Sequence, residues 1–219
     1  MEDLTILYYS SNRESPEFEG RVIKNLLENC GDLPIISITH QPMDLGNNIC
    51  VGDVGVSGFN MFRQVQLGLK KVETEFVISA EADCLYPPDY FKFVPEKNDV
   101  CYRNSNLYVM PDCRDFFFLK KEGATHSQVI GTRYYLDRLN ELFGDAPMWS
   151  PEEKNFPRER HGDVDVFNQI EYYKTENPVI QIKTHKGMRY YTHSERIPIP
   201  SLPYWGSGKD LRRYYLHGK

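Results

Sequence analysis

Short apolar runs alternate with amphipathic stretches along the chain, and the two periods predict a regular succession of strands and helices. The runs at residues 4–11, 33–41 and 75–82 are rich in β-branched and aromatic residues, which is typical of buried strands. Residues 16–31 and 59–72 instead place apolar side chains at helical spacing. Strand, helix and strand in this order predict a parallel sheet with helices on its faces.

The second half of the chain has a less regular pattern. Residues 99–121 predict alternating strands, residues 131–144 an amphipathic helix, and residues 178–185 a last strand. Residues 163–174 repeat apolar side chains at a spacing of three, which predicts another helix, whereas the Gly-rich residues 47–60 and the charged residues 149–162 predict irregular segments. We therefore expect one α/β domain, Rossmann-like in its mostly parallel, helix-flanked central sheet, with an irregular second half.

Composition fits a globular protein that works inside a cell. Hydrophobic residues make up 40% of the 219 residues and charged residues 26%, enough for a sizeable core without a disordered tract. The sequence has neither a membrane-spanning apolar run nor a signal peptide, so we expect a cytoplasmic protein, or one of the host cytoplasm if the source is viral. The five cysteines have no zinc-type spacing, which favours reduced and mostly buried thiols.

Charge is distributed unevenly along the chain. The formal net charge of −5 argues against a general nucleic-acid binder, yet residues 183–219 hold eight basic and two acidic residues, a local net charge of +6. Residues 196–219 interleave these basic residues with aromatic ones, a pattern that suits phosphates and stacked bases. The sequence thus predicts an anionic partner near a basic aromatic C-terminal tail.

Two carboxylates follow the third predicted strand. Glu81 and Asp83 are two residues apart, so in an extended chain their side chains share one face, at the end of the sheet where ligands of open α/β sheets bind. Like charges on one face require a cation, and Mg²⁺ or Mn²⁺ bridging to a phosphate would supply it. The alternative is that one carboxylate caps the turn before the prolines while the other is solvated.

The order of these segments resembles that of GT-A-fold glycosyltransferases, among them family 2 enzymes and animal galactosyltransferases of the lactose-synthase type. The likeness rests on the helix and strand FNMFRQVQLGLKKVETEFVISAEADCLYP, on GDVDVFNQI at residues 162–170 and on IQIKTH at residues 180–185. It implies a metal-dependent transfer of a sugar from a nucleotide diphosphate, a UDP-sugar above all, to a hydroxyl acceptor. Glu81 replaces the first Asp of the family's D-x-D motif, which leaves Asp83 as the better metal ligand.

The resemblance also assigns roles in the second half. It implies Asp163 as the base of an inverting transfer, with Asp165 as the alternative, although Asp163 as an ordinary helix cap remains open. It implies His185 as a further metal ligand, with His193 as the competitor. Lys186 and Arg189 follow His185 and are the candidate contacts of the diphosphate, where arginine offers a bidentate fork; a solvated basic turn is the alternative.

The nucleotide is expected at the end of the first strand. Residues 8–13 are the candidates, with at most one tyrosine on the base because alternate residues face the core: Tyr8, Tyr9, Ser10, Ser11, Asn12 and Arg13. Asp53 lies in a Gly-rich loop where the family places an acid near the uracil or ribose. Arg63 matches a helix arginine of the family that bonds the donor, with a surface ion pair as the alternative.

Acceptor binding is expected from the second half of the chain. Tyr134, Tyr135 and Trp149 are the predicted walls of the acceptor site, although aromatic residues in helices more often belong to the core. On this scheme residues 1–100 form the nucleotide-sugar half and residues 101–195 the acceptor and catalytic half. Candidate acceptors are hydroxymethylated DNA of the phage type and a lipid-linked or surface glycan. A nucleotidyltransferase and a non-catalytic module that binds sugar or nucleic acid remain the alternatives.

Overall fold

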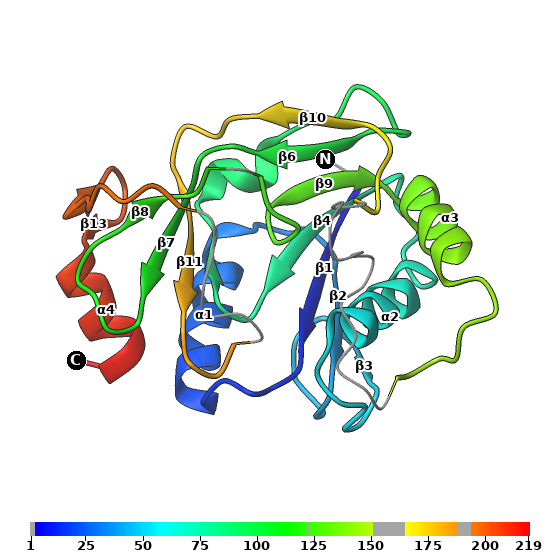
Figure 1. Ribbon diagram of the computed structural model, residues 1–219, viewed down its shortest axis with the longest axis horizontal. Coiled ribbons are helices and arrows are strands. Elements are labelled where there is room, and N and C mark those ends of the chain that lie inside the picture. The colour runs from blue at the N-terminus through cyan, green and yellow to red at the C-terminus, as the bar shows by residue number, and fades with distance from the viewer. Residues whose placement is uncertain (1–2, 122, 151–164, 188–193) are drawn as a thin grey trace.

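A seven-stranded central sheet forms the body of the protein in the computed structural model, which describes residues 3–121, 123–150, 165–187 and 194–219 (Figure 1). The strand order is β10-β6-β9-β4-β1-β2-β3, and β9 is the one strand of this sheet that runs antiparallel to its neighbours. The strands are β1 (Leu4–Ser10), β2 (Ile35–Thr39), β3 (Asn47–Cys50), β4 (Phe76–Glu81), β6 (Cys101–Asn104), β9 (Gln128–Gly131) and β10 (Ile170–Tyr173). The predicted α/β class with a mostly parallel sheet is confirmed.

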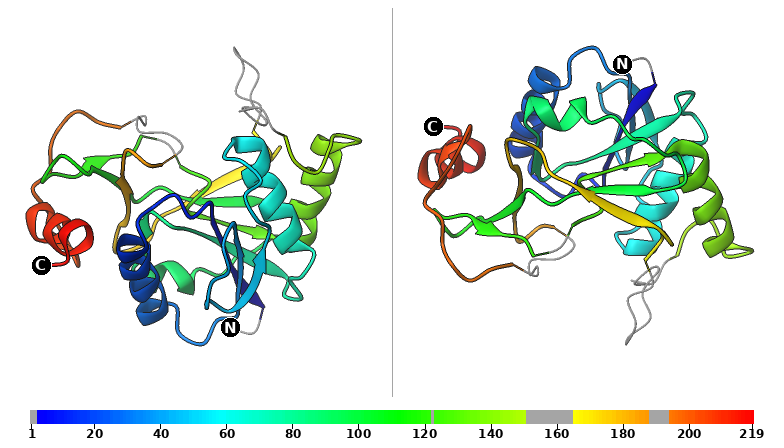
Figure 2. Two further views of the ribbon diagram at one scale, coloured as in Figure 1. Left: turned by 90° about the horizontal axis from the view of Figure 1, so that it is seen from below. Right: turned by 90° about the horizontal axis from the view of Figure 1, so that it is seen from above.

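Three helices cover the two faces of this sheet. Helix α1 (Pro16–Asn29) lies on one face, while α2 (Gly58–Leu69) and α3 (Thr132–Phe143) lie together on the other (Figure 2). Alternation along β1 feeds both layers, because Ile6 and Tyr8 join the core cluster that includes Leu26 of α1, and Leu7 joins the one that includes Phe62 of α2. Both faces of β1 are therefore buried, as expected for a central parallel strand.

Capping residues define where helices α1 and α2 begin, at the carboxyl edge of the central sheet. Ser15 precedes α1 and its hydroxyl accepts a hydrogen bond from Phe18 N, with Pro16 at the first helical position. Ser57 caps α2 in the same way by accepting from Asn60 N. These side chains satisfy amide groups that have no partner inside a helix. They also fix where the chain enters each helix from the carboxyl edge of the sheet.

A second, four-stranded sheet lies beside the first and was not predicted as a separate unit. Its order is β5-β11-β7-β8, and β11 pairs in parallel with β7. The remaining elements are β5 (Cys84–Leu85), the 3-10 helix η1 (Pro88–Lys92), β7 (Leu107–Pro111), β8 (Phe118–Leu119), β11 (Val179–Lys183), β12 (Ser201–Leu202), β13 (Gly206–Ser207) and α4 (Gly208–His217).

Residues 196–219 are part of the folded domain and not a loose tail. Leu211 and Tyr215 of α4 are buried in a cluster with Phe18 and Val22 of α1 and apolar residues of the second sheet. Figure 1 shows α4 at the end of the molecule beyond that sheet. Part of the basic aromatic segment therefore forms helix α4, and one of its aromatic rings, that of Tyr215, packs into the core.

Two sequence-based assignments of secondary structure are wrong. Within residues 163–174, predicted as a helix, the described part ends in strand β10, whose Ile170 pairs with Cys101 of β6. The segment Ile-Glu-Tyr-Tyr favours a strand by composition, and it forms the edge strand of the sheet by pairing with β6. Residues 47–50, predicted as irregular, form strand β3 beside β2. In both cases pairing with an existing strand decided the structure.

The cysteines and the helices settle two smaller points. None of the five cysteines forms a disulfide, and three of them are buried, Cys30, Cys84 and Cys101. The prediction that most of the thiols are buried is confirmed, with Cys50 and Cys113 exposed, and their reduced state stays a prediction. None of the helices within the described residues is both long enough and apolar enough to cross a membrane.

Candidate active site

A cleft opens at the carboxyl end of the central sheet, between the ends of β1, β2 and β4 and the start of α2. Open α/β sheets bind their ligands at this edge. Several predicted residues line the cleft, and others join them that were not predicted. The lining consists of Tyr9, Ser10, Ser11, Arg13, Glu14, His40, Gly55, Val56, Ser57, Met61, Gln64, Glu81, Ala82, Asp83, Lys186 and Gly187.

Glu81 and Asp83 both line this cleft, as their spacing predicted. Glu81 Oε1 accepts a 2.7 Å hydrogen bond from the Tyr9 hydroxyl, and Asp83 accepts from Gln181 Nε2 at 3.1 Å. Burial, and then the negative charge of Asp83, raises the pKa of Glu81 to about 7. The pair is therefore electrostatically unfavourable as it stands, and a divalent cation between the two would relieve it.

A third carboxylate was missed by the sequence analysis. Glu14, in the loop between β1 and α1, lines the same cleft and accepts a 2.5 Å hydrogen bond from the Thr184 hydroxyl. Burial raises the pKa of Glu14, and the charge of Asp83 adds to that rise. Mg²⁺ and Mn²⁺ prefer carboxylate oxygens, so Glu14 joins Glu81 and Asp83 as a candidate ligand of a hard divalent ion. The three carboxylates line one cleft, but they are not among the described groups whose ligand atoms all lie within 4.8 Å of one another.

Cationic and neutral polar groups face the same space. Arg13 and Lys186 line the cleft with the three carboxylates, which places positive charge beside the candidate metal ligands. His40, at the end of β2, lines it too, and its Nε2 is buried without a hydrogen-bond partner among the described residues. Burial lowers the pKa of His40, so the ring is neutral near pH 7. The strand-end position was the sequence signal that could have identified His40.

The predicted nucleotide contacts on β1 divide into two groups. Tyr9, Ser10, Ser11 and Arg13 line the cleft. Tyr8 does not, because its side chain is fully buried and its hydroxyl donates to Glu19 on α1 at 2.7 Å. The role predicted for Tyr8 is therefore wrong, and the alternation of the strand explains why only one of the two tyrosines reaches the cleft.

Asn12 and Asp53 lie at the rim and have different surroundings. Asn12 has a positive φ of 51°, and its Oδ1 accepts from Gln41 N at 2.9 Å, so its side chain shapes the turn that leaves β1. The Asp53 side chain is 96% exposed, with its Oδ1 4.0 Å from His40 Nδ1. Neither residue lines the cleft directly, and their predicted contact with the nucleotide remains a prediction.

Arg63 is a structural residue, so the predicted contact with the donor is wrong. Its guanidinium is buried, donates hydrogen bonds to the carbonyls of Ala146 and Pro147, and lies 3.7 Å from the centre of the Phe143 ring. These contacts tie α2 to the segment after α3. A surface ion pair, the alternative considered from the sequence, is not formed either.

Most of the described site residues that were predicted from the chain after β6 do not line the cleft. His185 follows β11 of the second sheet, where its Nδ1 lies 2.9 Å from Asp112 Oδ2, and it does not line the cleft. Asp165 forms a two-pronged ion pair with Arg103 at 2.7 and 2.8 Å, so its carboxylate is not available as a base. Asp163, Arg189 and His193 lie outside the described residues.

The predicted acceptor walls also separate. Tyr135 is buried against Phe167 in the core, and Tyr134 lines a different hollow beside Glu75, which precedes β4, at the opposite edge of the sheet. The acceptor roles predicted for Tyr134 and Tyr135 are therefore wrong. Helix α3 directs the Tyr135 ring into the core and the Tyr134 ring toward the other hollow. Trp149 is half-buried and does not line the cleft, but the next residue, Ser150, is bonded to Asn60 of α2. An acceptor role of Trp149 remains a prediction.

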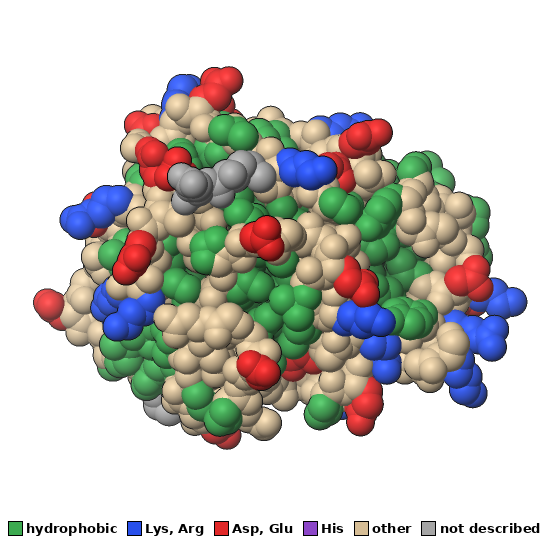
Figure 3. Space-filling model, turned by 180° about the vertical axis from the view of Figure 1, so that it is seen from behind, with side chains coloured by type: hydrophobic (Ala, Val, Ile, Leu, Met, Phe, Trp, Pro, Cys, Tyr) green, Lys and Arg blue, Asp and Glu red, His purple; other side chains and the backbone are tan. Residues whose placement is uncertain are grey.

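On one face of the protein, the charged side chains of the described residues do not form a single broad basic patch that would suit an anionic partner (Figure 3). On the face shown in Figure 3, acidic and basic side chains are interspersed with hydrophobic ones between them. Basic side chains gather at the end of the molecule that α4 occupies, where Lys209 and Arg213 are exposed. Arg212 is engaged, since it donates to the carbonyl of Asp112 and pairs with Asp115.

Comparisons with known proteins reveal a partial likeness of fold. TarS of S. aureus in complex with UDP-GlcNAc is 12% identical, with a TM-score of 0.49 over 87% of this chain and 60% of that one. A glycosyltransferase involved in glycosylation of the major capsid of PBCV-1 is 12% identical, with a TM-score of 0.47 over 82% and 93% of the two chains. The bifunctional IspDF from Campylobacter jejuni is 13% identical, with a TM-score of 0.44 over 80% and 50%.

The sequence comparisons give no family. No protein-family model matches the chain, and no curated protein matches it. This chain spans 60% of the length of the TarS chain to which it is similar.

Proposed function

We propose that this protein transfers a sugar from a nucleotide diphosphate donor, a UDP-sugar, to a hydroxyl acceptor with the help of a divalent ion. The observation that supports this most is that three carboxylates, Glu14, Glu81 and Asp83, line one strand-end cleft together with Arg13 and Lys186. Carboxylates hold the metal, and cations beside them hold phosphate oxygens. A metal-bridged diphosphate satisfies both sets of charges together.

Each part of the cleft has a role in this proposal. Asp83 and Glu81 hold the ion, which when bound stabilises the charge of the departing diphosphate. Lys186 and Arg13 bind the diphosphate, and Ser10 and Ser11 contact the ribose. His40 is placed against the nucleobase, because a buried ring nitrogen without a partner needs one from the ligand.

The acceptor side of the proposal rests on the sequence. Asp163 is proposed as the base that removes the proton from the acceptor hydroxyl, which gives inversion at the sugar carbon. The ion pair of Asp165 with Arg103 leaves Asp163 as the better of the two candidates. The helix dipole does not support Asp163 in this role, since residues 165–169 are not helical. We keep an anionic acceptor as part of the proposal.

Thermal unfolding with UDP and Mn²⁺ tests the donor site. A ligand that binds the folded state at 100 times its Kd stabilises it by about 2.7 kcal/mol, which for a domain of this size raises Tm by about 5–10 °C. We expect such a shift for UDP with Mn²⁺, and a much smaller one for UDP with EDTA. Asp83→Asn should lose most of the metal-dependent part, while Asp44→Asn, at an exposed position, should keep it.

The outcome separates the proposal from its alternatives. An equal shift for Asp83→Asn and the unchanged protein would remove the metal-bridged site from consideration. Absence of any shift with UDP, UDP-sugars or other nucleoside diphosphates would contradict the donor assignment as a whole. Release of UDP from a UDP-sugar upon addition of acceptor then distinguishes sugar transfer from nucleotidyl transfer, which releases pyrophosphate.

A further inference from the structure

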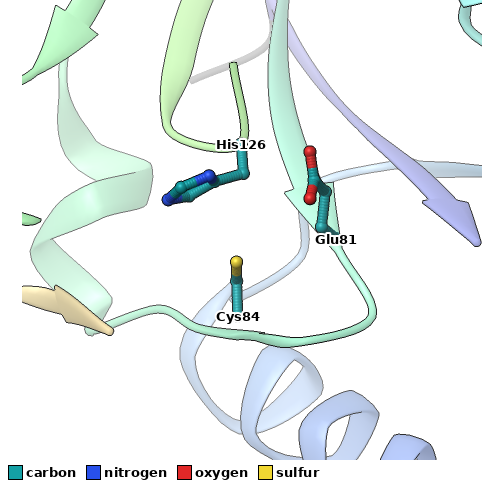
Figure 4. Close-up of side chains that lie close together, drawn as sticks. All are labelled: Glu81, Cys84 and His126. Atoms are coloured by element: carbon teal, nitrogen blue, oxygen red, sulfur yellow. The ribbon is translucent and has the colours of Figure 1, made fainter. Parts of the chain in front are cut away.

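A second group of ligand-type side chains lies inward of the cleft. Glu81 ends β4, Cys84 begins β5, and His126 lies in the loop before β9. One ligand atom of each, a carboxylate oxygen, the thiol sulfur and a ring nitrogen, lies within 4.8 Å of the other two. Figure 4 shows the Cys84 sulfur directed toward the imidazole of His126, with Glu81 on the neighbouring strand.

The environment of this group differs from that of the open cleft. Cys84 is fully buried and His126 is 4% exposed, and Cys84 belongs to the apolar core cluster between β1, β4 and α1. Glu81 alone among the three also lines the cleft, so it connects the buried pair with solvent. A polar ring and a thiol inside an apolar core are stabilised by any partner that binds both.

We propose that Glu81, Cys84 and His126 form a binding site for a divalent ion of the zinc class. Thiolate and imidazole ligands select Zn²⁺ and Co²⁺ over Mg²⁺, which prefers oxygen ligands alone. The site shares Glu81 with the proposed transfer reaction, but Cys84 and His126 have no part in that reaction, and binding of the ion to them requires no nucleotide. The site assigns to Cys84 and His126 a chemistry that neither the sequence spacing nor the cleft indicated.

The backbone around the group is held in place by one hydroxyl. The Tyr86 hydroxyl accepts a 3.0 Å hydrogen bond from Glu81 N and donates a 2.8 Å bond to the His126 carbonyl. Two of the three ligand-bearing residues are thereby fixed relative to each other without their side chains.

Modest side-chain movement and the loss of one proton complete the site. Zn–S bonds of about 2.3 Å and Zn–N bonds of about 2.0 Å require the ligand atoms to approach one another by on the order of 1 Å. The Cys84 thiol lies 3.2 Å from Asp83 Oδ1. On binding, the S–H bond breaks, the proton leaves to solvent through the cleft and the sulfur bonds to the ion, so that binding releases one proton.

Cobalt spectroscopy tests the proposal, because a thiolate bound to Co²⁺ gives an intense near-ultraviolet charge-transfer band. The exposed thiols Cys50 and Cys113 are first replaced by Ser, and the double variant is titrated with Co²⁺. We expect one Co²⁺ per chain, a charge-transfer band that Zn²⁺ removes, and d–d bands of tetrahedral intensity. Cys84→Ser in this background should lose the charge-transfer band, and His126→Asn should weaken binding by at least about tenfold.

Folding controls keep the outcome decisive. Far-ultraviolet circular dichroism and the Tm without metal show whether each variant is folded, and Glu81→Gln serves as a further ligand variant if His126→Asn is not. A folded double variant that shows no charge-transfer band, or a band that persists in folded Cys84→Ser, overturns the proposal. The band requires no nucleotide, so its absence leaves the proposed transfer reaction untouched, and its presence does not depend on it.

Discussion

Glu81, at the end of β4, contacts both the cleft and the buried Cys84–His126 group. Its carboxylate accepts a hydrogen bond from the Tyr9 hydroxyl and lines the cleft with Asp83. An oxygen of the same carboxylate lies within 4.8 Å of the Cys84 sulfur and a His126 ring nitrogen. Desolvation is the largest cause of its raised pKa, and the charge of Asp83 is the second. Without a cation nearby, ionisation of Glu81 therefore lowers the free energy of unfolding.

The pH dependence of stability follows from this raised pKa. The folded state holds the Glu81 proton up to about pH 7, whereas the unfolded chain loses it near 4.5, so stability without metal falls as the pH rises through this window. Glu81→Gln removes this loss. In urea unfolding with EDTA at pH 8 the variant should be more stable than the unchanged protein by up to about 3 kcal/mol.

The same measurement at low pH supplies the internal control. Near pH 4.5 Glu81 is protonated in the folded state, and the two proteins should differ little. Glu96→Gln, at an exposed position, should show no such pH-dependent difference. A Glu81→Gln variant that is less stable than the unchanged protein at pH 8 would show that the carboxylate has a favourable partner in the absence of metal.

At the scale of elements, Gly68 lets α2 pack closely on β1 and β2. A Cβ there would lie 2.4 Å from Ile38 Cδ1 and 2.5 Å from Leu7 Cδ1, closer than side-chain atoms pack. We expect Gly68→Ala to destabilise the protein by about 1–3 kcal/mol through overpacking, despite the higher helix propensity of alanine. Equilibrium unfolding measures this.

A second glycine provides the matched control for that variant. Gly20 lies in α1, and a Cβ there would meet no atom within 4 Å. Gly20→Ala should therefore stabilise the protein by about 0.5–1 kcal/mol. Equal effects at both positions would mean that helix propensity, and not contact with β1 and β2, sets the energetics of α2.

Prediction from sequence succeeded where one element determines its own structure. The strand-end rule located Glu81 and Asp83, and helix periodicity located α1, α2 and α3. It failed where a partner decides: β10 became a strand because β6 was beside it, and Arg63 turned inward because the Ala146 and Pro147 carbonyls needed donors.

The site was predictable to the same extent. Residues that leave the central sheet directly, such as Ser10, Ser11 and Asp83, line the cleft as expected. Glu14 and His126 come from loops whose positions depend on long-range packing, and neither spacing nor composition marks them. His185 was misplaced because β11 belongs to the second sheet, which the sequence did not separate from the first.

At the scale of the whole molecule, α4 supports the cleft through α1. Arg21 of α1 donates a 2.8 Å hydrogen bond to the Tyr215 carbonyl, and α1 begins at the loop that carries Arg13 and Glu14. The second sheet lies beside both helices through the cluster that contains Phe18 and Leu211. The C-terminal segment is therefore part of the scaffold that positions one wall of the cleft.

Truncation of a buried side chain on α4 tests this integration. Leu211 is 5% exposed, and Leu211→Ala should cost about 2–4 kcal/mol and lower the Tm of the entire protein by about 5–15 °C in one transition. Tyr214, the outward neighbour at 41% exposure, is the matched position, and Tyr214→Ala should change the Tm by less than about 2 °C.

If α4 were an independent appendage, Leu211→Ala would leave the main transition unchanged and add a separate early one. Circular dichroism monitors the helices, and tryptophan fluorescence in a Trp149→Phe background, which leaves Trp205 just before α4 as the one tryptophan, monitors that region. Coincidence of the two signals, both shifted by Leu211→Ala, is the expected result, because a shared core cluster unfolds as a unit.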